Sequence, residues 1–479
     1  MSRGNTWYSV LTALLCIPLY FSCTNKWIQA NPPSLHNSAA GNATDTVTVA
    51  EDTAESVDFA DAFDPSIPLP GEKNPENVHA ATPSSDTSPS PSATAFIVPT
   101  DRVRIALVRN SGRMIVYSVG NVRLHSARQP VSDQCRGRLV FEARSGGRVR
   151  MTFGMRVAEA SLPCTLLSEQ AYNFLEIGDA TYRGALILAP GNKGTLTAVN
   201  YLEVEEYLRG VVPLELGKRS EEEIEALKAQ AVAARTYTYR RILERTQQPY
   251  DMVATVADQV YGGVSAEYRE ADRAIKATAG LILTYGDSII LAYYHSTCGG
   301  ITANVEEVWD KPAQPYLRSI TDRDGSGRAW CRSSAYFTWE ESWPWKQFSG
   351  IVITSLRKVF PQRTFRGVVN SVNVNKRYSC GRIAALTITG SGWAQECGGD
   401  QVRFILRRGS SGYPILRSAN FEVVPSDRAA IKLQGKGYGH GVGMCQMGAI
   451  GRSQAGENFR SILQAYYTGV SVSSVVAER

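Results

Sequence analysis

One carboxylate is distinguished by the residues on either side of it. Glu215 follows a short apolar run at residues 211–214 and precedes Gly217. A helix is predicted to begin just beyond, because Ser220 and Glu223 have the types and spacing of a capping box. We therefore expect Glu215 in a strand-to-helix turn. A loop carboxylate between two rigid elements can be functional, although the ordinary interpretation is a solvated glutamate.

The predicted helix offers a second candidate residue, Arg235. Apolar residues recur at helical spacing from Ile224 to Ala234, which gives the helix a narrow apolar face. Arg235 lies about four helical turns beyond the N-cap, so the helix alone does not bring it to Glu215. A long Arg side chain can still reach a shared groove, and an exposed helical Arg remains the alternative.

A glycine-rich segment near the C-terminus carries a histidine. Residues 435–448 include five glycines within nine positions, and His440 lies between two of them. The segment is not a phosphate-binding P-loop, because no Gly-Lys-Ser/Thr follows at the required spacing. Glycines let the backbone approach a ligand closely, so we expect His440 to be accessible. A second histidine, His295, also lies in a glycine-rich motif, at the end of an apolar run.

His295 introduces a set of candidate metal ligands. Cys298 lies three residues beyond it, and Cys331 can supply a third ligand. The alternative, which we favour in an exported chain, is a disulfide between Cys298 and Cys331. Six cysteines beyond residue 23 fall into three pairs of sequence neighbours, and Cys445 is left over. The pairs are Cys135 with Cys164, Cys298 with Cys331, and Cys380 with Cys397.

These candidates point to chemistry that needs one acid. The sequence has neither a credible Ser–His–Asp order nor an HExxH motif. Most glycosidases need two carboxylates at a defined separation. A single protonated Glu is sufficient when an internal hydroxyl of the sugar attacks the anomeric carbon. Such an acid needs a raised pKa, which we expect from the apolar residues Val211, Val212 and Leu214.

The N-terminus predicts export. Arg3 precedes an apolar stretch at residues 7–21, which is too short and too interrupted by proline for a confident membrane span. Ser22 before Cys23 resembles a bacterial lipobox, so Cys23 is a candidate for lipidation. Simple cleavage and an uncleaved anchor are the alternatives. We expect a protein of the cell envelope that is anchored outside the cytoplasm.

Charge is unevenly distributed along the chain. The formal net charge is +6, yet residues 24–97 hold ten acidic side chains and two lysines. The remainder is therefore clearly basic, which favours an anionic partner. No zinc finger, recognition-helix pattern or Lys/Arg block supports nucleic acid. An anionic polymer of the cell envelope is the better expectation.

Periodicity predicts an α+β fold with a β-rich body and a few helices. A hairpin is predicted where residues 182–188 and 196–201 flank a Pro-Gly-Asn-Lys-Gly turn. Helices are expected around residues 266–278 and 459–467.

Five stretches, in order, resemble the SpoIID/LytB family, the stage II sporulation protein D group of lytic transglycosylases and amidase enhancers. They cover roughly residues 100 to 475. They are residues 206–215, residues 225–237, residues 295–300 with 308–309 and 315–317, residues 416–418 with 421, and the Gly-His-Gly motif at 439–441.

The resemblance implies a peptidoglycan lytic transglycosylase, a lyase that cleaves the MurNAc–GlcNAc β-1,4 bond and leaves 1,6-anhydro-MurNAc. Glu215 is then the catalytic acid and base. No cofactor is required, although zinc in some relatives keeps a metal site open. A groove for the glycan strand is implied to be lined by Arg235, His295, Tyr438, His440 and Gln446.

The same resemblance implies a two-lobed catalytic region. The expected ranges are an export or lipoprotein signal at 1–23, a disordered acidic Pro/Ser/Thr-rich tether at 24–97, a β-rich part at 98–200, a catalytic core at 201–310, a loop- and strand-rich second lobe at 311–430, and a C-terminal segment at 431–479 that completes the core.

The chain departs from the family pattern in two places. Leu216-Gly217 replaces the Met-Pro that usually follows the catalytic Glu, so we expect a looser turn there. Cys445 replaces a Ser before Gln446. One alternative is a non-catalytic, wall-binding enhancer of an N-acetylmuramoyl-L-alanine amidase. Another is a structural lipoprotein of the envelope.

Overall fold

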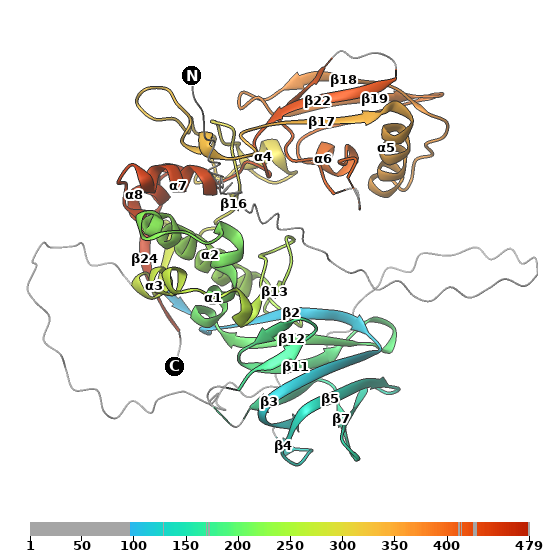
Figure 1. Cartoon of the computed structure of the whole chain (residues 1–479), viewed down its shortest axis with the longest axis vertical. Helices are drawn as coiled ribbons and strands as arrows, with labels where there is room; N and C mark the ends of the chain where they lie inside the picture. The colour runs from blue at the N-terminus through green and yellow to red at the C-terminus, as the bar shows by residue number, and fades with distance from the viewer. Residues whose placement is uncertain are drawn as a thin grey trace, which may run out of the picture. The chain divides into compact units, whose positions relative to one another are not determined.

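The computed structural model describes residues 96–477, apart from 128, 169, 171–172, 411, 413 and 425–428. The predicted export signal, Cys23 and almost all of the predicted tether lie outside the described residues. The fold is α+β and rich in strands, as the sequence predicts (Figure 1). Among the described helices, none combines the length and the apolar character needed to cross a membrane.

The N-terminal strands form a twelve-stranded, mostly antiparallel sheet. The predicted hairpin is confirmed, because Ala185 pairs with Tyr201 and Pro190 with Leu196 across the turn. One face of this sheet packs its own apolar cluster. The strands are β2 (Arg102–Ser111), β3 (Arg113–Ser126), β4 (Gln129–Pro130), β5 (Cys135–Arg144), β6 (Arg148–Phe153), β7 (Arg156–Ser161), β8 (Cys164–Ser168), β9 (Leu175–Ile177), β10 (Ala180–Tyr182), β11 (Ala185–Pro190), β12 (Leu196–Glu203) and β13 (Met252–Val253).

A helical core follows the sheet. Its helices are α1 (Val204–Leu216), α2 (Ile224–Glu244), α3 (Arg269–Ala277), α4 (Val305–Val308), α7 (Gln446–Gln454) and α8 (Phe459–Tyr466). Within the described residues, short 3₁₀ turns accompany the sheet and the core: η2 (Asn192–Gly194), η3 (Glu221–Glu223), η4 (Gly263–Ala266) and η5 (Trp330–Ser333). The predicted helices around residues 266–278 and 459–467 are confirmed as α3 and α8.

The C-terminal segment returns to this core. Strand β24 (Ser471–Ala477) pairs with β1 (Phe96–Val98) and with β14 (Leu281–Tyr285), and β15 (Ser288–Ile289) extends the sheet beyond β14. A second, parallel pairing joins β16 (Tyr294–His295) to β23 (Met444–Cys445). The glycine-rich segment is thereby held beside the strand that carries His295.

Helix α1 corrects the prediction that Glu215 lies in a turn. The apolar run at residues 211–214 is helical, and Glu215 belongs to the last turn. The buried residues recur at the three- and four-residue spacing of a helix that starts earlier than the run itself. Among them are Val204, Tyr207, Leu208, Val211, Val212 and Leu216.

Helix α2 is the most enclosed element of the core. Every residue from Ala229 to Tyr239 is buried, and α1, α3, α7, α8 and β14 all contact the helix. Its buried surface is therefore much wider than the predicted narrow face, because small alanines admit neighbours on several sides. The helix begins at Ile224 after η3, and the Ser220 side chain makes no capping hydrogen bond, so the predicted capping box is absent.

A second lobe has its own apolar core, spanning Trp339 to Leu433. Its elements occupy residues 338–436. The sequence missed helix α5, although Phe348, Val352 and Leu356 lie on one face. The elements are β17 (Thr338–Pro344), α5 (Trp345–Val359), β18 (Val369–Arg377), β19 (Ile383–Gly390), β20 (Trp393–Cys397), α6 (Gln401–Ile405), β21 (Phe421–Val424) and β22 (Ala430–Lys436).

Arg235 is an internal connector of the core. Its guanidinium is fully buried and binds Glu205 at the start of α1 through two hydrogen bonds of 2.7 and 2.8 Å. It also donates to the carbonyl of Leu281 at 3.1 Å. A buried Arg is tolerated because its donors are directed at a carboxylate and at carbonyls.

Replacing Arg235 tests this structural role. Arg235→Ala leaves Glu205 without its partner and opens a cavity, so we expect the free energy of unfolding to fall by about 3 kcal/mol. Chemical denaturation monitored by circular dichroism measures it. The matched control is Arg240→Ala on the same helix, whose partly exposed i,i+4 pair with Glu244 is worth about 0.5 kcal/mol. Equal losses in the two variants would contradict the assignment.

Candidate active site

Glu215 lies where three segments of the chain converge, and the residue as a whole is half-buried. Its own helix, α1, ends one residue later. The backbone N–H of Val260 donates a hydrogen bond to Oε1 at 2.9 Å. The side chain of Gln446, the first residue of α7, also favours the ionised form of this carboxyl. Val260 follows Glu215 by 45 positions in the sequence, and Gln446 follows it by 231. Distant parts of the chain therefore act on one carboxyl group.

This setting changes the acidity of Glu215. Burial raises the pKa of the carboxyl to about 7, and the bonds from Val260 and Gln446 lower it less than burial raises it. The direction is the one that the sequence predicts. The contribution expected from Leu214 is absent, because that side chain is 46% exposed, whereas Val211 and Val212 are buried in the core. Near neutral pH, such a carboxyl can both give and take a proton.

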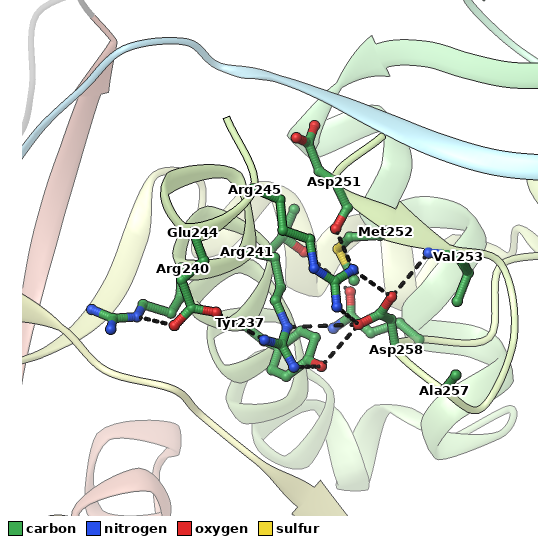
Figure 2. Close-up of polar contacts among 12 residues, drawn as sticks. Tyr237, Arg240, Arg241, Glu244, Arg245, Asp251, Met252, Val253, Ala257 and Asp258 are labelled. Carbon is green, nitrogen blue, oxygen red and sulfur yellow. Dashed lines mark hydrogen bonds and ion pairs between the residues drawn. The ribbon is translucent and has the colours of Figure 1, made fainter. Parts of the chain in front are cut away.

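The loop that carries Val260 is held by a buried carboxylate, Asp258 (Figure 2). Its side chain accepts hydrogen bonds from Arg245 at 2.9 Å, the Val253 N–H at 3.0 Å and the Tyr237 hydroxyl at 3.2 Å. Figure 2 shows Asp258 between the end of α2 and the loop that follows it. These contacts attach the loop to α2. They thereby fix the position of the Val260 N–H, which donates a hydrogen bond to Glu215.

Gln259 adds a second attachment of the same loop. The side chain is fully buried, and its amide nitrogen donates to Ala234 O at 3.3 Å and to the Tyr294 hydroxyl at 2.9 Å. Its amide oxygen accepts from the Tyr207 hydroxyl at 3.1 Å. Sequence reasoning missed both Asp258 and Gln259, because an isolated Asp-Gln pair in a loop carries no periodic or motif signal.

The two histidines predicted to line the groove lie together. Their ring centroids are 5.5 Å apart. Nδ1 of His295 lies 3.2 Å from Val442 O, and the Val442 N–H donates to Nδ1 of His440 at 3.1 Å. Burial lowers the pKa of His440 to about 3, and burial together with His440 lowers that of His295. Both imidazoles are therefore neutral near pH 7, which suits hydrogen bonding and stacking rather than acid catalysis.

His440 belongs to an aromatic patch that the sequence did not identify as a site. Its ring lies 4.8 Å from that of Trp309, and Trp309 lies 4.7 Å from Tyr293. All three side chains are half-buried. The ammonium of Lys311 lies 5.1 Å from the Tyr293 ring centroid and 5.2 Å from that of Trp309. The only signal was the family resemblance of residues 308–309, which did not by itself indicate a role.

Two other predicted groove residues lie elsewhere. Arg235 is fully buried and bound to Glu205, which contradicts the prediction that it contacts a glycan. Tyr438 packs edge-on against Tyr336 with centroids 4.9 Å apart, and its backbone pairs with Thr297. Of the implied groove residues, Gln446 is the one whose side chain lowers the pKa of Glu215.

The described cysteines form no disulfide. All seven are free thiols, so the three predicted pairings, Cys298–Cys331 included, are absent. The Sγ atoms of Cys298 and Cys331 lie 3.5 Å apart, beyond the bonded distance of about 2.05 Å. Cys445 and Asp322 join them in a buried cluster, to which His295 does not belong. The predicted ligand set of His295, Cys298 and Cys331 is therefore wrong in its histidine.

Gly217 ends α1 rather than loosening it. Its φ of 79° is a conformation that favours glycine. Its N–H donates to Pro213 O at 3.0 Å, and its carbonyl accepts from the Tyr268 hydroxyl at 3.2 Å. Leu216 is buried in the core. The expectation of a looser turn is therefore wrong, because Leu216 is fixed by packing and Gly217 by hydrogen bonds.

Comparisons with known proteins match both the helical core and the second lobe. A family model described as stage II sporulation protein matches residues 192–285, which contain α1, α2 and α3. A domain of unknown function matches residues 329–443, which contain the second lobe.

Curated relatives extend the match. An uncharacterised protein of Brachyspira hyodysenteriae is 30% identical over 327 residues, which cover 68% of this chain and 81% of that protein. An amidase enhancer of Bacillus subtilis is 30% identical over 303 residues, covering 56% of this chain and 40% of that protein. A stage II sporulation protein D of Bacillus amyloliquefaciens is 29% identical over 310 residues, covering 62% and 81%.

Gln446 offers a test of how the carboxyl is held. Its hydrogen bond favours the ionised form of Glu215, so Gln446→Ala is expected to raise the pKa above about 7. The pH dependence of the carboxyl signal in ¹³C-Glu NMR, assigned with Glu215→Gln, measures it. Gln454→Ala is the control, because Gln454 lies on the same helix and bonds Glu223 instead. An unchanged or lowered pKa in Gln446→Ala would disprove the contact.

Proposed function

Because this chain belongs to the stage II sporulation protein D family, we propose that it is a peptidoglycan lytic transglycosylase. It would cleave the MurNAc–GlcNAc β-1,4 bond and leave 1,6-anhydro-MurNAc. A role at the cell wall is supported by the family and by the name of the amidase enhancer. The finer proposal depends on one observation, the buried Glu215 carboxyl whose pKa is raised to about 7.

The reaction uses this single carboxyl twice. Protonated Glu215 donates its proton to the glycosidic oxygen as the bond from that oxygen to C1 breaks. The carboxylate then accepts the proton of the C6 hydroxyl while O6 bonds to C1 of the same sugar. One proton is given and one is taken, so the enzyme ends as it began and water is not consumed. A pKa near the working pH serves both halves of this cycle.

The surroundings support a sugar ligand. The half-buried rings of Tyr293, Trp309 and His440 offer flat apolar faces of the kind that pack against sugar rings. The exposed ammonium of Lys311 lies over two of them and favours an anionic group such as a muramyl lactate or stem-peptide carboxylate. Tyr294 directly follows Tyr293 of this patch, and its hydroxyl accepts a hydrogen bond from Gln259. This contact connects the aromatic patch with the loop of Val260.

The proposal places the protein in the cell envelope. The names of the relatives and the predicted export signal at residues 1–23 support this location. Peptidoglycan strands are the proposed substrate. Attachment to a membrane through the N-terminal signal, or through a lipid on Cys23, is part of the proposal.

An amidase enhancer is the second candidate function. It is favoured by the 30% identity to the Bacillus subtilis amidase enhancer, of which this chain covers 40%. A protein of this kind binds the wall and stimulates an N-acetylmuramoyl-L-alanine amidase without cleaving glycan. Incubating denuded glycan strands and intact peptidoglycan with and without the amidase separates the two functions. Anhydro products without amidase support the first function, and products only with amidase support the second.

Replacing the acid tests the transglycosylase directly. Glu215→Gln keeps the size of the side chain but removes the proton donor, so release of anhydro-muropeptides should fall by at least about 10²-fold. Mass spectrometry of the products of denuded glycan strands measures this. Retention of full activity would end the catalytic assignment.

Two controls accompany that variant. Glu222→Gln changes an exposed acid on η3 and should leave activity unchanged. Thermal unfolding checks the fold of Glu215→Gln. The pKa of Glu215 is higher in the folded than in the unfolded protein. The wild type therefore loses the stabilising contribution of this group as pH rises from about 4.5 to 7, whereas Glu215→Gln has no such contribution to lose. A variant that is folded but inactive assigns the loss to chemistry.

The pH profile gives an independent test. The proton donor exists only below the pKa of Glu215, so kcat/KM should fall about tenfold per pH unit above roughly pH 7. Initial rates on soluble glycan strands between pH 5 and about 9 measure it. A profile that stays level to pH 9 would contradict an acid with this pKa.

A further inference from the structure

We propose that one zinc ion is bound in a closed structural site by four side chains: Cys298, Asp322, Cys331 and Cys445. All four are fully buried. One ligand atom from each lies within 4.8 Å of every other. The inference goes beyond the proposed transglycosylase activity and does not depend on it.

The spacing of the ligand atoms fits a tetrahedral ion. Zinc bonds of about 2.3 Å to sulfur place two sulfur ligands about 3.8 Å apart. The Sγ atoms of Cys298 and Cys331 lie 3.5 Å apart, and Sγ of Cys298 lies 3.3 Å from Oδ2 of Asp322. A small inward or outward adjustment of side chains is enough to receive the ion.

The backbone around the sulfurs is arranged as it would be around thiolates. The N–H of Cys298 donates to Sγ of Cys445 at 3.2 Å, and the N–H of Gly448 donates to the same sulfur at 3.3 Å. The N–H of Gly300 donates to Sγ of Cys298 at 3.2 Å. Donors directed at a sulfur stabilise its negative charge, and such outer contacts orient metal ligands.

Asp322 has matching outer partners. Its two oxygens accept from the Tyr466 hydroxyl, each at 3.0 Å, and Oδ1 also accepts from Arg452 at 3.2 Å. The fourth ligand is thereby held in place and its charge is partly balanced. When the three thiols lose their protons on metal binding, the divalent ion offsets the buried charge of the thiolates and the carboxylate.

The ligand types select the ion. Three thiolates favour a soft or borderline cation such as Zn²⁺ over Mg²⁺ or Ca²⁺, which prefer oxygen. Four protein ligands fill a tetrahedral shell and leave no position for water, so the site is structural rather than catalytic. Binding requires the three thiols to lose their protons, and zinc uptake therefore releases protons.

The ion would join segments that meet only in the folded protein. Cys298 follows β16, Cys331 lies in η5, and Cys445 is the N-cap of α7. Cys445 directly precedes Gln446, which contacts Glu215. The site would therefore fix the start of α7, and with it one of the two donors to the candidate acid.

Metal content tests the proposal without reference to activity. The full chain, purified without a metal-affinity tag and under reducing conditions, should contain about one zinc per chain by plasma mass spectrometry. After removal of the metal, one equivalent of Co²⁺ should give the intense visible and thiolate charge-transfer bands of tetrahedral coordination. Protein that takes up neither ion stoichiometrically overturns the proposal.

Variants identify the ligands. Cys445→Ala should lower the zinc content to near zero, and Asp322→Asn should weaken zinc affinity by at least about tenfold. Cys397→Ala removes a buried thiol of the second lobe and should leave zinc content unchanged. A ligand variant can misfold. If it does, the cobalt titration of the wild-type protein alone decides whether the site binds a metal. Peptide mapping that finds a Cys298–Cys331 disulfide in metal-free native protein overturns the site.

Discussion

The burial of one carboxyl group is the constraint on which the candidate site depends. Ionising Glu215 inside the protein is unfavourable, and only the Val260 N–H and Gln446 offset it. With more donors the group would be a permanent carboxylate, and with none it would scarcely ionise near pH 7. Because the two donors come from separate segments, the acidity of Glu215 is a property of the tertiary structure rather than of the residues beside it in sequence.

Helix α2 holds in place both groups that act on Glu215, the loop of Val260 and the side chain of Gln446. Tyr237 donates to Asp258 and Ala234 accepts from Gln259, so the loop of Val260 is attached to α2 at two points. Gln230 of the same helix accepts from Gln446 at 3.4 Å. A shift of α2 would move both donors relative to α1. The ion pair of Arg235 with Glu205 links α2 to α1 and opposes such a shift, so this residue matters to the site as a support.

Local periodicity was sufficient for α2, α3, α8 and the hairpin, because their signals lie within a few residues. The periodicity of α1 is also present in the sequence, because its buried positions begin at Val204. The short apolar run before Glu215, interpreted alone, nevertheless predicts a strand. Helix α7 is different. Its Gly448 and Gly451 disfavour a helix locally, yet a Cβ at these positions would lie 2.1 Å from the Tyr466 hydroxyl and 2.3 Å from Trp330 O. These glycines are required by packing, which the sequence does not display. The sequence brought Cys298 and Cys331 together, but the presence of Cys445 and Asp322 beside them escaped prediction for the same reason, since both come from distant parts of the chain.

The position beside Glu215 where the chain departs from its family is consistent with the same constraint. Leu216 is apolar and close in volume to the Met that it replaces, so the core below the helix end can be filled without rearrangement. Gly217 replaces the fixed φ of a proline by a left-handed residue whose N–H and carbonyl are both bound. The backbone on this side of Glu215 is thus restrained by hydrogen bonds rather than by a ring. The freedom that remains lies in the side-chain torsions of Glu215, and these are limited by the contacts with Val260 and Gln446. The orientation of the acid therefore depends on the start of α7, where the proposed zinc ligand Cys445 immediately precedes Gln446.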